Sequence, residues 1–341
     1  NLEAIELNRS VESVLVTGGG GFLGGVIVRM MLAEGARVSS FSREIYPDLE
    51  ALGVKQFEGD LRDRNAFFTA SKGIDVVFHT AAKAGGWGKY QDYFDINVKG
   101  TENVIAGCRY HQVSRLIYTS SPSVVFDRGD KAGIDESAPY ATRFQTHYPA
   151  TKAMAEQAVR KVGRDGFATI SLRPHLIWGP GDNHLVPRIL NRAKRLRRIG
   201  DGSNLVDTTY IDNAAFAHVL AARKLKENRT LSGNVYFISQ GTPILLWEMV
   251  DHILAAAGKD PVKGHVSPRV AWVAGAILEG IYKLLHLSSE PFMTRFGATE
   301  LSTSHWFDIS AARRDLGYEP KISTEEGLSR LARWLKTQAI T

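Results

Sequence analysis

"SVLVTGGGGFLGG", residues 13–25, decides the fold of this chain. A short β-branched run ends in four consecutive glycines, and a helical stretch follows from Phe22 until Gly35 ends it. In a strand–turn–helix unit, glycines permit a tight turn and a close approach of the backbone to a pyrophosphate, while the helix N-terminus supplies positive potential. An ordinary glycine-rich turn is the alternative, but strand, glycines and helix follow one another in order. The stretch predicts a dinucleotide site.

Alternating strand-like and helical segments continue through the first half of the chain. Strands are predicted at 13–18, 37–42, 54–59, 75–80, 115–120 and 168–173, with helices near 63–71, 93–109 and 148–163. Such alternation is typical of a parallel sheet with helices on both faces. We therefore expect an α/β fold, a Rossmann-type doubly wound parallel sheet.

The second half of the chain lacks this regular alternation. It predicts a basic helix at about 185–198, a helix near 212–226, a strand at 234–239 and a mainly helical remainder from Gly241. We expect a dinucleotide-binding Rossmann domain at 1–178, to which 206–239 returns. Segments 179–205 and 240–341 would form a smaller, mostly helical substrate-binding region.

The composition of the 341-residue chain, 44% hydrophobic and 23% charged, is that of a soluble globular protein. The 42 Lys and Arg against 36 Asp and Glu give a formal net charge of +6, which permits anionic ligands without requiring nucleic acid, and no nucleic-acid partner is expected. The single cysteine, Cys108, excludes an intrachain disulfide, and we expect no metal site. The first residues do not read as a secretory signal, so we expect a cytoplasmic protein.

One segment, Val270–Leu287, approaches the length of a membrane span. Glu279 and Lys283 interrupt it, so we expect an amphipathic helix with a wide apolar arc and no transmembrane segment. Small residues, Ala274 and Gly280, leave room beside the large ones. One hypothesis is that the helix roofs a channel for an alkyl chain, and plain core packing is the alternative.

A second unusual segment is basic. Six of the eleven residues from Arg188 to Arg198 are Lys or Arg, with Ile189, Ala193 and Leu196 as the matching apolar stripe. A solvated helix face and a docking surface for an acidic partner both fit this pattern, and the sequence leaves both open.

The residues that end the second predicted strand bear on which dinucleotide binds. An Asp or Glu at that place contacts the ribose hydroxyls of NAD. Here Ser42 and Arg43 follow the strand, and a hydroxyl with a guanidinium suits the 2′-phosphate of NADP. Two alternatives are open: Glu44 faces the ribose, which would favour NAD, or Arg43 is simply a solvated surface charge. The sequence favours NADP.

"HYPATK", residues 147–152, places Tyr148 four residues before Lys152 at a predicted helix start, with Pro149 expected at the first helical position. The two side chains would share one helix face. The pattern fits a surface pair as well as a phenol tuned by an ammonium neighbour, so the rest of the chain must decide.

Glycines in the pattern T-G-x-x-G-x-x-G, followed about 130 residues later by Y-x-x-x-K, resemble the short-chain dehydrogenase/reductase superfamily. The motifs "VFHTAA", "NVKGTENV", "YTSSPSVVF", "HYPATK", "RPHLIWGPGD", "DTTYIDN" and "DLGYEP" resemble its extended branch. The resemblance implies that Tyr148 is the acid or base at a carbonyl or hydroxyl group. It implies that Lys152 holds the nicotinamide ribose and lowers the pKa of the phenol. Ser121, with Ser120 beside it, would bond the reacting oxygen.

The same resemblance implies the cofactor contacts. They are the glycine loop and helix start (Gly18, Gly21, Phe22, Leu23), Ser42 and Arg43, an adenine-contacting pair (Asp60, Leu61), the nucleotide edge (Ala81, Ala82), the brace Asn97, Thr119 with Tyr148 and Lys152, and a carboxamide-facing segment (Pro174, His175, Leu176). For Asp60 and Asn97, a turn or a capped helix is the alternative. For His79 and His175, core or backbone-positioning roles are favoured over catalysis.

The branch of the family follows from smaller signals. Pro122 and Ser123 replace the Asp–Glu pair of the sugar 4,6-dehydratases, and neither can move a proton, so that chemistry is excluded. Sugar epimerases remain possible by fold. The segments "SSPSVVF" and Val270–Leu287 resemble the 3β-hydroxysteroid dehydrogenase and sterol-4-carboxylate dehydrogenase group, whose substrates are apolar.

Four longer segments carry a narrower resemblance: "AAKAGGWGKYQDYFDINVKGTENVIAGCR", "LIWGPGDNHLVPRIL", "GDGSNLVDTTYIDNAA" and "TRFGATELSTSHW". They resemble the ketoreductases of bacterial long-chain olefin biosynthesis. The resemblance implies NADPH-dependent reduction of the 3-keto group of a long-chain 2-alkyl-3-oxoalkanoic acid to the 2-alkyl-3-hydroxyalkanoic acid. Lys83 and Arg188 are candidate partners of the substrate carboxylate, although both also fit as surface charges.

Expected partners are the apolar keto-acid substrate, other enzymes of the same pathway and a second copy in a homodimer. The enzyme alternative is a 3β-hydroxysteroid or sterol-4-carboxylate 3-dehydrogenase using NAD(P). A non-catalytic dinucleotide sensor is the alternative from another class. Such a sensor would be expected to have lost Ser121, Tyr148 or Lys152, and all three are present.

Overall fold

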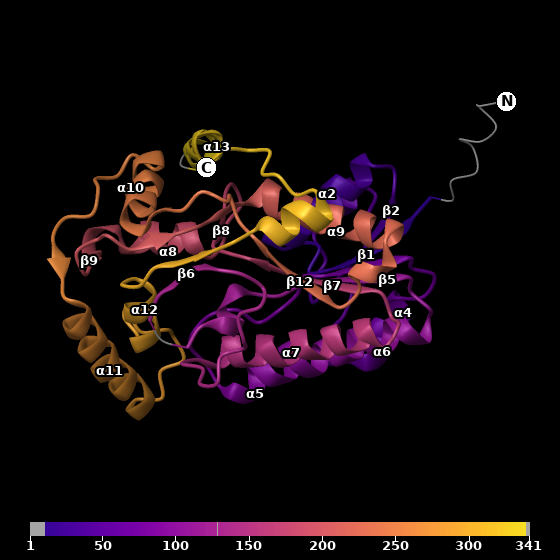
Figure 1. The fold of residues 1–341 in the computed structure, drawn as a ribbon, viewed down its shortest axis with the longest axis horizontal. Helices are drawn as coiled ribbons and strands as arrows, with labels where there is room; N and C mark the ends of the chain where they lie inside the picture. Colours follow the sequence, from indigo (N-terminus) through magenta and orange to yellow (C-terminus); the bar gives the residue numbers. More distant parts are fainter. Residues whose placement is uncertain (1–10, 128, 339–341) are drawn as a thin grey trace.

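A seven-stranded parallel sheet forms the centre of the computed structural model, which describes residues 11–127 and 129–338 (Figure 1). Its strand order is β12-β7-β5-β4-β1-β2-β3. The strands are β1 Ser13–Thr17, β2 Arg37–Ser42, β3 Lys55–Glu58, β4 Val76–His79, β5 Arg115–Thr119, β7 Thr169–Pro174 and β12 Asn234–Ile238. The predicted fold class is confirmed, and each predicted strand lies within two residues of its observed bounds.

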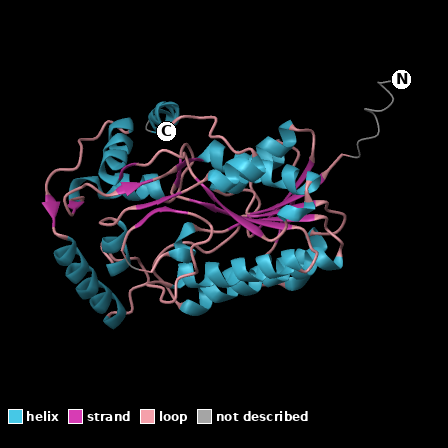
Figure 2. Ribbon diagram, viewed as in Figure 1, coloured by secondary structure: helices cyan, strands magenta, loops and turns pink. Residues whose placement is uncertain are grey.

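Helices cover both faces of this sheet, so the strands are buried on both sides and read as continuous apolar runs (Figure 2). One face carries α2 Phe22–Ala33 and α9 Ile211–Glu227 (Figure 1). The other carries α4 Arg64–Ala70, α6 Gly100–Tyr110 and α7 His147–Arg164. A short helix, α3 Pro47–Ala51, follows β2.

The strand order reverses between β1 and β4, because the chain runs outward from β1 to β3 and then returns to β4. In sheets of this kind, ligands bind beyond the carboxyl ends of the strands at the point of reversal. We therefore expect the ligand site at the loops after β1 and β4.

The helix predicted at 93–109 differs from a regular α-helix. It begins as α5 Tyr90–Tyr93, passes through a π-helical turn at Phe94–Lys99 and continues as α6. A π turn widens the helix locally, and such turns are frequent at functional sites. Asn97, a predicted cofactor-site residue, lies within this turn.

A smaller set of elements lies beyond the carboxyl ends of the main strands (Figure 1). Its four-stranded sheet has the order β13-β10-β15-β6, and two-stranded pairs join β8 to β11 and β9 to β14. The strands are β6 Lys131–Ile134, β8 Ile177–Trp178, β9 Arg198–Ile199, β10 Leu205–Val206, β11 Thr209–Tyr210, β13 Ile244–Leu245, β14 His265–Val266 and β15 His305–Phe307. The helices are α8 Leu185–Arg192, α10 Leu246–Ala256, α11 Pro268–Leu284, α12 Arg295–Glu300 and α13 Thr324–Gln338.

Two helix predictions need correction in this part of the chain. The basic helix predicted at 185–198 ends at Arg192, since a 3₁₀ turn follows and Arg198 enters β9 to pair with β14. The helix predicted at 270–287 is present as α11, but its apolar stripe faces outward, with Ile277 and Leu284 exposed. The outward orientation contradicts the hypothesis that these side chains roof a channel. Among the described residues, no helix has the length and apolar content of a membrane span.

Candidate active site

Tyr148 and Ser121 meet at the carboxyl end of the main sheet. Tyr148 is the second residue of α7, which starts at His147, two residues earlier than the position of Pro149 predicted. Ser121 follows β5 and caps a 3₁₀ turn, where its hydroxyl accepts the N–H of Ser123 at 3.2 Å. Burial raises the pKa of the Tyr148 phenol to about 12, and a hydrogen bond with Ser121 partly opposes this effect. The phenol is therefore protonated at neutral pH.

Lys152 lies one helical turn after Tyr148 and is buried, with an exposed fraction of 2%. Its Nζ donates to the carbonyl oxygen of Thr119 at 2.6 Å and lies 4.2 Å from the ring centroid of Tyr118. Desolvation lowers the pKa of Lys152 to about 7. The expectation that Lys152 lowers the pKa of Tyr148 is not met: the pKa of the phenol is raised, and Ser121 is the group that lowers it. The desolvated ammonium is turned toward Thr119 instead.

A buried ion pair that was not predicted from the sequence lies one helical turn after Lys152. Glu156, one turn further along α7, accepts hydrogen bonds from Arg173 Nη2 at 2.6 Å and Nε at 2.9 Å, and from the Tyr140 hydroxyl at 2.6 Å. Burial works to raise the pKa of Glu156, but the contacts with Arg173 outweigh it and lower the pKa. The resulting carboxylate favours the charged form of Lys152. The i, i+4 spacing of Lys152 and Glu156 was the signal available in the sequence.

The glycine loop has the geometry that a pyrophosphate requires. Gly18 has φ +71°, which favours glycine, and its N–H donates to the carbonyl oxygen of Phe41 on β2 at 2.8 Å. A Cβ on Gly24 would lie 2.1 Å from the oxygen of Gly18, so this glycine lets α2 pack closely on the loop. Gly21 precedes α2 without a side-chain cap, and the first turn, which contains Phe22 and Leu23, has no acidic residue. The N-terminal N–H groups are thus available to an anion.

Ala81 and Ala82 follow β4 beside this loop. A Cβ on Gly18 would lie 3.3 Å from the Cα of Ala81, and the Ala81 N–H donates to Thr17 Oγ1 at 3.2 Å. His79 joins the same strands through its Nδ1, 2.8 Å from Thr17 Oγ1. Burial lowers the pKa of His79 to about 3, so its ring is neutral. Its contacts agree with the expected positioning role.

The predicted adenosine contacts lie next to each other at the end of β2. Ser42 pairs with Glu58 in β3, and its carbonyl accepts the Gly59 N–H at 2.8 Å, directly before Asp60. The ion pair with Arg62, at 2.7 Å, lowers the pKa of Asp60. Arg43 is exposed and has no ion pair among the described residues. The side chain of Leu61 packs in the core, which leaves its backbone as the accessible part.

Asn97 links the loop after β4 to α7. Its Oδ1 accepts the Lys83 N–H at 2.8 Å, and its Nδ2 donates to the Lys83 carbonyl at 3.0 Å and lies 3.1 Å from Thr151 Oγ1. Thr151 is the neighbour of Lys152. The π turn thus holds the loop after β4 against α7, whereas Asn97 was expected to brace the active-site strand.

The two candidate cations for a substrate carboxylate lie around the same loop. Lys83 Nζ lies 5.2 Å from the Tyr93 ring centroid, whereas Arg188 pairs with Glu290 at 2.6 Å. A Cβ on Gly86 would lie 3.8 Å from Glu290 Oε1, so the ion pair borders the Lys83 loop. The structure brings both cations to one region, but the charge of Arg188 is already matched.

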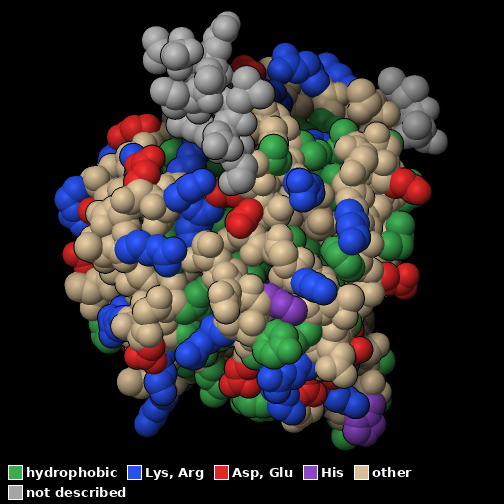
Figure 3. All heavy atoms as spheres, turned by 90° about the vertical axis from the view of Figure 1, so that its right-hand side faces the viewer, with side chains coloured by type: hydrophobic (Ala, Val, Ile, Leu, Met, Phe, Trp, Pro, Cys, Tyr) green, Lys and Arg blue, Asp and Glu red, His purple; other side chains and the backbone are tan. Residues whose placement is uncertain are grey.

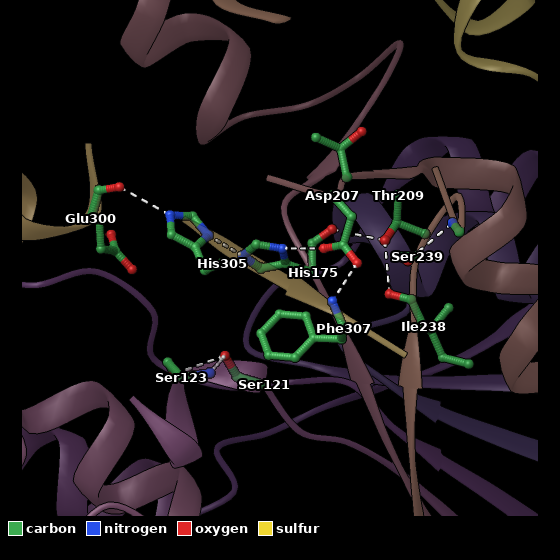
Figure 4. A network of polar contacts seen from close by, with 12 residues as sticks. Ser121, Ser123, His175, Asp207, Thr209, Ile238, Ser239, Glu300, His305 and Phe307 are labelled. Atoms are coloured by element: carbon green, nitrogen blue, oxygen red, sulfur yellow. Dashed lines mark hydrogen bonds and ion pairs between the residues drawn. The ribbon is translucent and has the colours of Figure 1, made fainter. Parts of the chain in front are cut away.

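The predicted carboxamide-facing segment, Pro174 to Leu176, continues β7 into a hydrogen-bonded chain (Figure 4). His175 Nδ1 lies 2.6 Å from Asp207 Oδ1, and His175 lies 3.1 Å from His305 through Nε2 and Nδ1. His305 Nε2 in turn lies 2.9 Å from the Glu300 carbonyl oxygen. Leu176 has φ +41°, a left-handed conformation that is uncommon outside glycine. These hydrogen bonds tie the end of β7 to β15. His175 therefore holds the backbone at the end of β7 in position, as expected.

Asp207, Glu300 and His305 were not assigned from sequence, although "DTTYID" and "TRFGATELSTSHW" contain them. Burial, with the neighbouring His175, lowers the pKa of His305 to about 3. Desolvation raises the pKa of Glu300 to about 7. Glu300, His305 and Pro149, the neighbour of Tyr148, line one small pocket.

The residues present fit a bound dinucleotide. The uncapped N-terminus of α2 and the glycine loop suit the diphosphate, and Ser42 with Arg43 lies where the adenosine ribose would be. Lys152 uses one of its three N–H donors on Thr119, which leaves donors for a ribose hydroxyl. Thr119 also lies 2.8 Å from His218 Nε2 through its hydroxyl, which fixes this strand end.

Comparison with known proteins agrees with this geometry. The model of the 3-beta hydroxysteroid dehydrogenase/isomerase family matches residues 15–267. A 2-alkyl-3-oxoalkanoate reductase of Stenotrophomonas maltophilia (strain K279a) is 50% identical over 323 residues, covering 93% of this chain and 98% of the relative. The human sterol-4-alpha-carboxylate 3-dehydrogenase, decarboxylating, is 31% identical over 337 residues, covering 97% and 90%.

Solved structures share the fold at lower identity. The UDP-glucose 4-epimerase of Thermus thermophilus, solved in complex with NAD, has a TM-score of 0.72 at 24% identity and covers 95% of this chain and 99% of that one. The protein gox2253 has a TM-score of 0.77 at 24% identity, covering 96% and 98%. These similarities concern the arrangement of the sheet and its helices.

Proposed function

Since this chain belongs to the 3-beta hydroxysteroid dehydrogenase/isomerase family, we propose that it is an NADPH-dependent ketoreductase. Its reaction is reduction of the 3-keto group of a long-chain 2-alkyl-3-oxoalkanoic acid to the 2-alkyl-3-hydroxyalkanoic acid, a step of olefin hydrocarbon biosynthesis. The observation that carries the proposal is 50% identity over nearly the whole chain to a 2-alkyl-3-oxoalkanoate reductase, combined with the meeting of Ser121 and the protonated Tyr148.

The choice of NADPH over NADH rests on the end of β2. Ser42 ends the strand and Arg43 follows it, where NAD-binding relatives of this fold class place an acidic residue. Arg43 is exposed and unpaired among the described residues, so its guanidinium is available to a 2′-phosphate. A nicotinamide dinucleotide is in keeping with the NAD bound in the epimerase of the same fold.

Bound NADPH supplies the hydride that reduces the keto carbon. The protein supplies the proton and the geometry. As negative charge develops on the former carbonyl oxygen, the Tyr148 hydroxyl donates its proton to that oxygen. The raised pKa of the phenol keeps this proton in place at neutral pH. Ser121 bonds the same oxygen and thereby fixes the carbonyl against Tyr148.

Lys152 positions the reaction without taking the proton. Its remaining N–H donors hold the ribose of the cofactor, while the Thr119 carbonyl fixes its Nζ. The buried Glu156 carboxylate favours the ammonium form against desolvation. Asn97 and Thr151 hold the loop after β4 against the same helix, so the cofactor and substrate sides of the site are braced together.

A pocket beside Pro149, with Phe126 and Phe296 in its walls, is the candidate place for one alkyl chain. Lys83 lies in the loop after β4, with its Nζ 5.2 Å from the ring centroid of Tyr93. We assign Lys83 in preference to Arg188 to the substrate carboxylate, because Glu290 already neutralises Arg188.

The second candidate function is a 3β-hydroxysteroid or sterol-4-carboxylate 3-dehydrogenase. It is favoured by relatives with those names at 31% to 36% identity. One is the 3beta-hydroxysteroid-dehydrogenase/decarboxylase isoform 2 of Arabidopsis thaliana, which is 36% identical over 342 residues. The chain covers 60% of the length of that Arabidopsis relative, and 98% of the length of the 2-alkyl-3-oxoalkanoate reductase. A homodimer, contact with other enzymes of the same pathway and a cytoplasmic address stay predictions from the sequence.

A panel of cofactor-oxidation assays tests the proposal. The purified chain is given NADPH or NADH with a 2-alkyl-3-oxoalkanoic acid, an unbranched β-keto acid or a 3-ketosteroid, and absorbance of the reduced nicotinamide is followed. We expect the highest kcat/KM for NADPH with the branched β-keto acid. Faster turnover of the ketosteroid would favour the second candidate, and no turnover of any ketone would refute both.

A further inference from the structure

Helix α11 presents a continuous apolar stripe to solvent. Val270, Val273, Ile277, Ile281 and Leu284 recur on one side of the helix, and each is between 44% and 78% exposed. Leu285 and Leu287, just after the helix, are also exposed. Residues 270–287 hold eight of the fifteen exposed large hydrophobic side chains of the described residues. The opposite end of the molecule instead mixes charges of both signs with small hydrophobic areas (Figure 3).

The orientation of α11 is fixed by its inner side. A Cβ on Gly275 would lie 2.6 Å from the carbonyl carbon of Thr294, so α12 can approach this helix only at a glycine. Glu279 is buried on the same side, where it accepts the Arg295 N–H at 2.7 Å and Nε at 2.9 Å. Turning the helix to bury the stripe would break these contacts. The exposed stripe therefore belongs to the folded state.

Unpaired cations lie near both ends of α11. Arg269 and Lys283 lie near the ends of α11, and the pairing of β9 with β14 brings the basic segment 194–198 beside the start of the helix. Among the described residues, Lys194, Arg195, Arg197, Arg269 and Lys283 form no ion pair. Of the neighbouring carboxylates, Glu279, Glu290 and Asp251 are engaged by Arg295, Arg188 and Arg198. Asp201, beside Arg198 and His265, forms no ion pair among the described residues. The surface thus combines an apolar ridge with an excess of positive charge.

The C-terminal end of α11 borders the candidate active site. Trp87, in the loop after β4, donates its indole N–H to the Leu287 carbonyl at 3.3 Å and packs edge-on against Tyr282. Burial, together with the charge of Lys283, lowers the pKa of His147, the residue before Tyr148. The C-terminal end of α11 therefore lies against the loop that follows β4.

We propose that α11 docks the protein on the surface of an anionic lipid bilayer. The stripe lies in the interface between headgroups and acyl chains, with the helix parallel to the membrane, and the surrounding cations contact anionic headgroups. Because α11 borders the loop after β4, docking turns the active-site mouth toward the layer in which a long-chain acid dissolves. The delivery of a long-chain acid from the bilayer to the active site rests on the proposed function, whereas docking itself does not.

A second copy of the chain fits this surface less well. Pairing through the same stripe about a two-fold axis would bring the five unpaired cations of one copy against those of the other. An anionic bilayer matches both features of the surface at once.

Cosedimentation with vesicles tests the docking. The probes are vesicles of phosphatidylcholine alone and of phosphatidylcholine with about 30% phosphatidylglycerol, at low and high salt. We expect binding to the anionic vesicles that is at least about tenfold stronger than to neutral ones and that falls with salt. The Ile277→Ser/Ile281→Ser and Arg269→Gln/Lys283→Gln variants should each bind at least about tenfold less.

Matched controls lie on other surfaces. Leu52→Ser removes a hydrophobic side chain as exposed as Ile281, and Lys161→Gln/Arg164→Gln removes two unpaired cations from α7. Both should bind vesicles like the parent chain, and thermal unfolding verifies that all variants are folded. Equal loss in the control variants, or no binding to anionic vesicles, would overturn the proposal. A dimer in sedimentation analysis that Ile277→Ser/Ile281→Ser dissociates would assign the stripe to a second copy instead.

Activity separates this proposal from the proposed function. With a short, water-soluble β-keto acid, the Ile277→Ser/Ile281→Ser variant should turn over like the parent chain, while turnover of a long-chain substrate held in vesicles should fall at least about tenfold. A chain that binds anionic vesicles and reduces no β-keto acid would retain the docking and refute the ketoreductase. Equal turnover of the vesicle-held substrate by parent and variant would refute the delivery role.

Discussion

The carboxyl end of the main sheet and helix α11 depart from the usual distribution of polar and apolar side chains in opposite ways. At the sheet, Lys152 and Glu156 are charged side chains in the protein interior. At α11, a five-residue apolar stripe is exposed while Glu279 is buried behind it. Burying a charge or exposing a large apolar surface is unfavourable unless something compensates. Inside the protein, Arg173 compensates for the Glu156 carboxylate while the Lys152 ammonium is only partly compensated, whereas the α11 stripe requires a partner outside the chain.

The largest effect is expected at the sheet, for Tyr148→Phe. The substitution keeps the ring and removes the proton donor, so kcat should fall about 10²- to 10⁴-fold while the Kd for NADPH changes little. Steady-state kinetics and a cofactor titration measure the two quantities. More than a few per cent of the parent activity would mean that another group donates the proton.

Lys152→Met tests whether the buried charge is kept at the expense of stability. An unfolded lysine titrates near 10.5 and the folded Lys152 near 7, so between these values the unfolded chain binds more protons. The contribution of Lys152 to the free energy of unfolding is therefore least favourable below pH 7 and improves as the pH rises toward 10.5.

The Met variant should consequently gain thermal stability, most at pH 6 and least at pH 9.5, while losing most of its activity and its affinity for NADPH. Unfolding curves at the two pH values give the comparison, with the parent chain as the reference. A variant that is less stable than the parent at pH 6 would show that the contacts of Lys152 outweigh its desolvation.

Arg43→Ala examines the cofactor end of the same sheet. Loss of a charge-assisted hydrogen bond to a 2′-phosphate is worth about 1.5–3 kcal/mol, so the Kd for NADPH should rise about ten- to a hundredfold. The Kd for NADH should stay nearly unchanged, since NADH has no such phosphate. Fluorescence titration distinguishes the two cofactors, and equal weakening of both would contradict the NADP assignment.

The sequence predicted the sheet end better than α11 because the signals there are local. The glycines of residues 18–24 and the spacing of Tyr148 and Lys152 each act within one turn or one helix, so type and spacing suffice. The Glu156–Arg173 pair joins α7 to β7, and the hydrogen bonds of His175 to Asp207 and to His305 join segments 32 and 130 residues apart. Periodicity within one segment holds no information about such pairings.

For α11, periodicity identified the helix and its apolar side but not the direction that side faces. The usual assumption, that the apolar side packs inward, is wrong here because Gly275 admits α12 and Glu279 meets Arg295. The basic segment 188–198 was mistaken for one helix since its extended end at Arg198 depends on β14, more than sixty residues later.

The smallest effects separate the two sides of α11. Gly275→Val should lower the free energy of unfolding by about 2 kcal/mol or more, because its side chain would collide with the backbone of α12. Ile277→Ser, on the exposed stripe, should change it by less than about 0.5 kcal/mol. Denaturant unfolding of both variants gives the values. A larger loss for Ile277→Ser than for Gly275→Val would mean that the stripe is packed in solution.

Isotope transfer tests the central claim most directly. The protein is incubated with a 2-alkyl-3-oxoalkanoic acid and NADPH that carries deuterium at both C4 positions of the nicotinamide, and the product is analysed by mass spectrometry. The account predicts a 2-alkyl-3-hydroxyalkanoic acid with one deuterium at C3, and nearly none of it from the Tyr148→Phe variant. Recovery of the unreduced keto acid, or of a hydroxy acid without deuterium at C3, would contradict it.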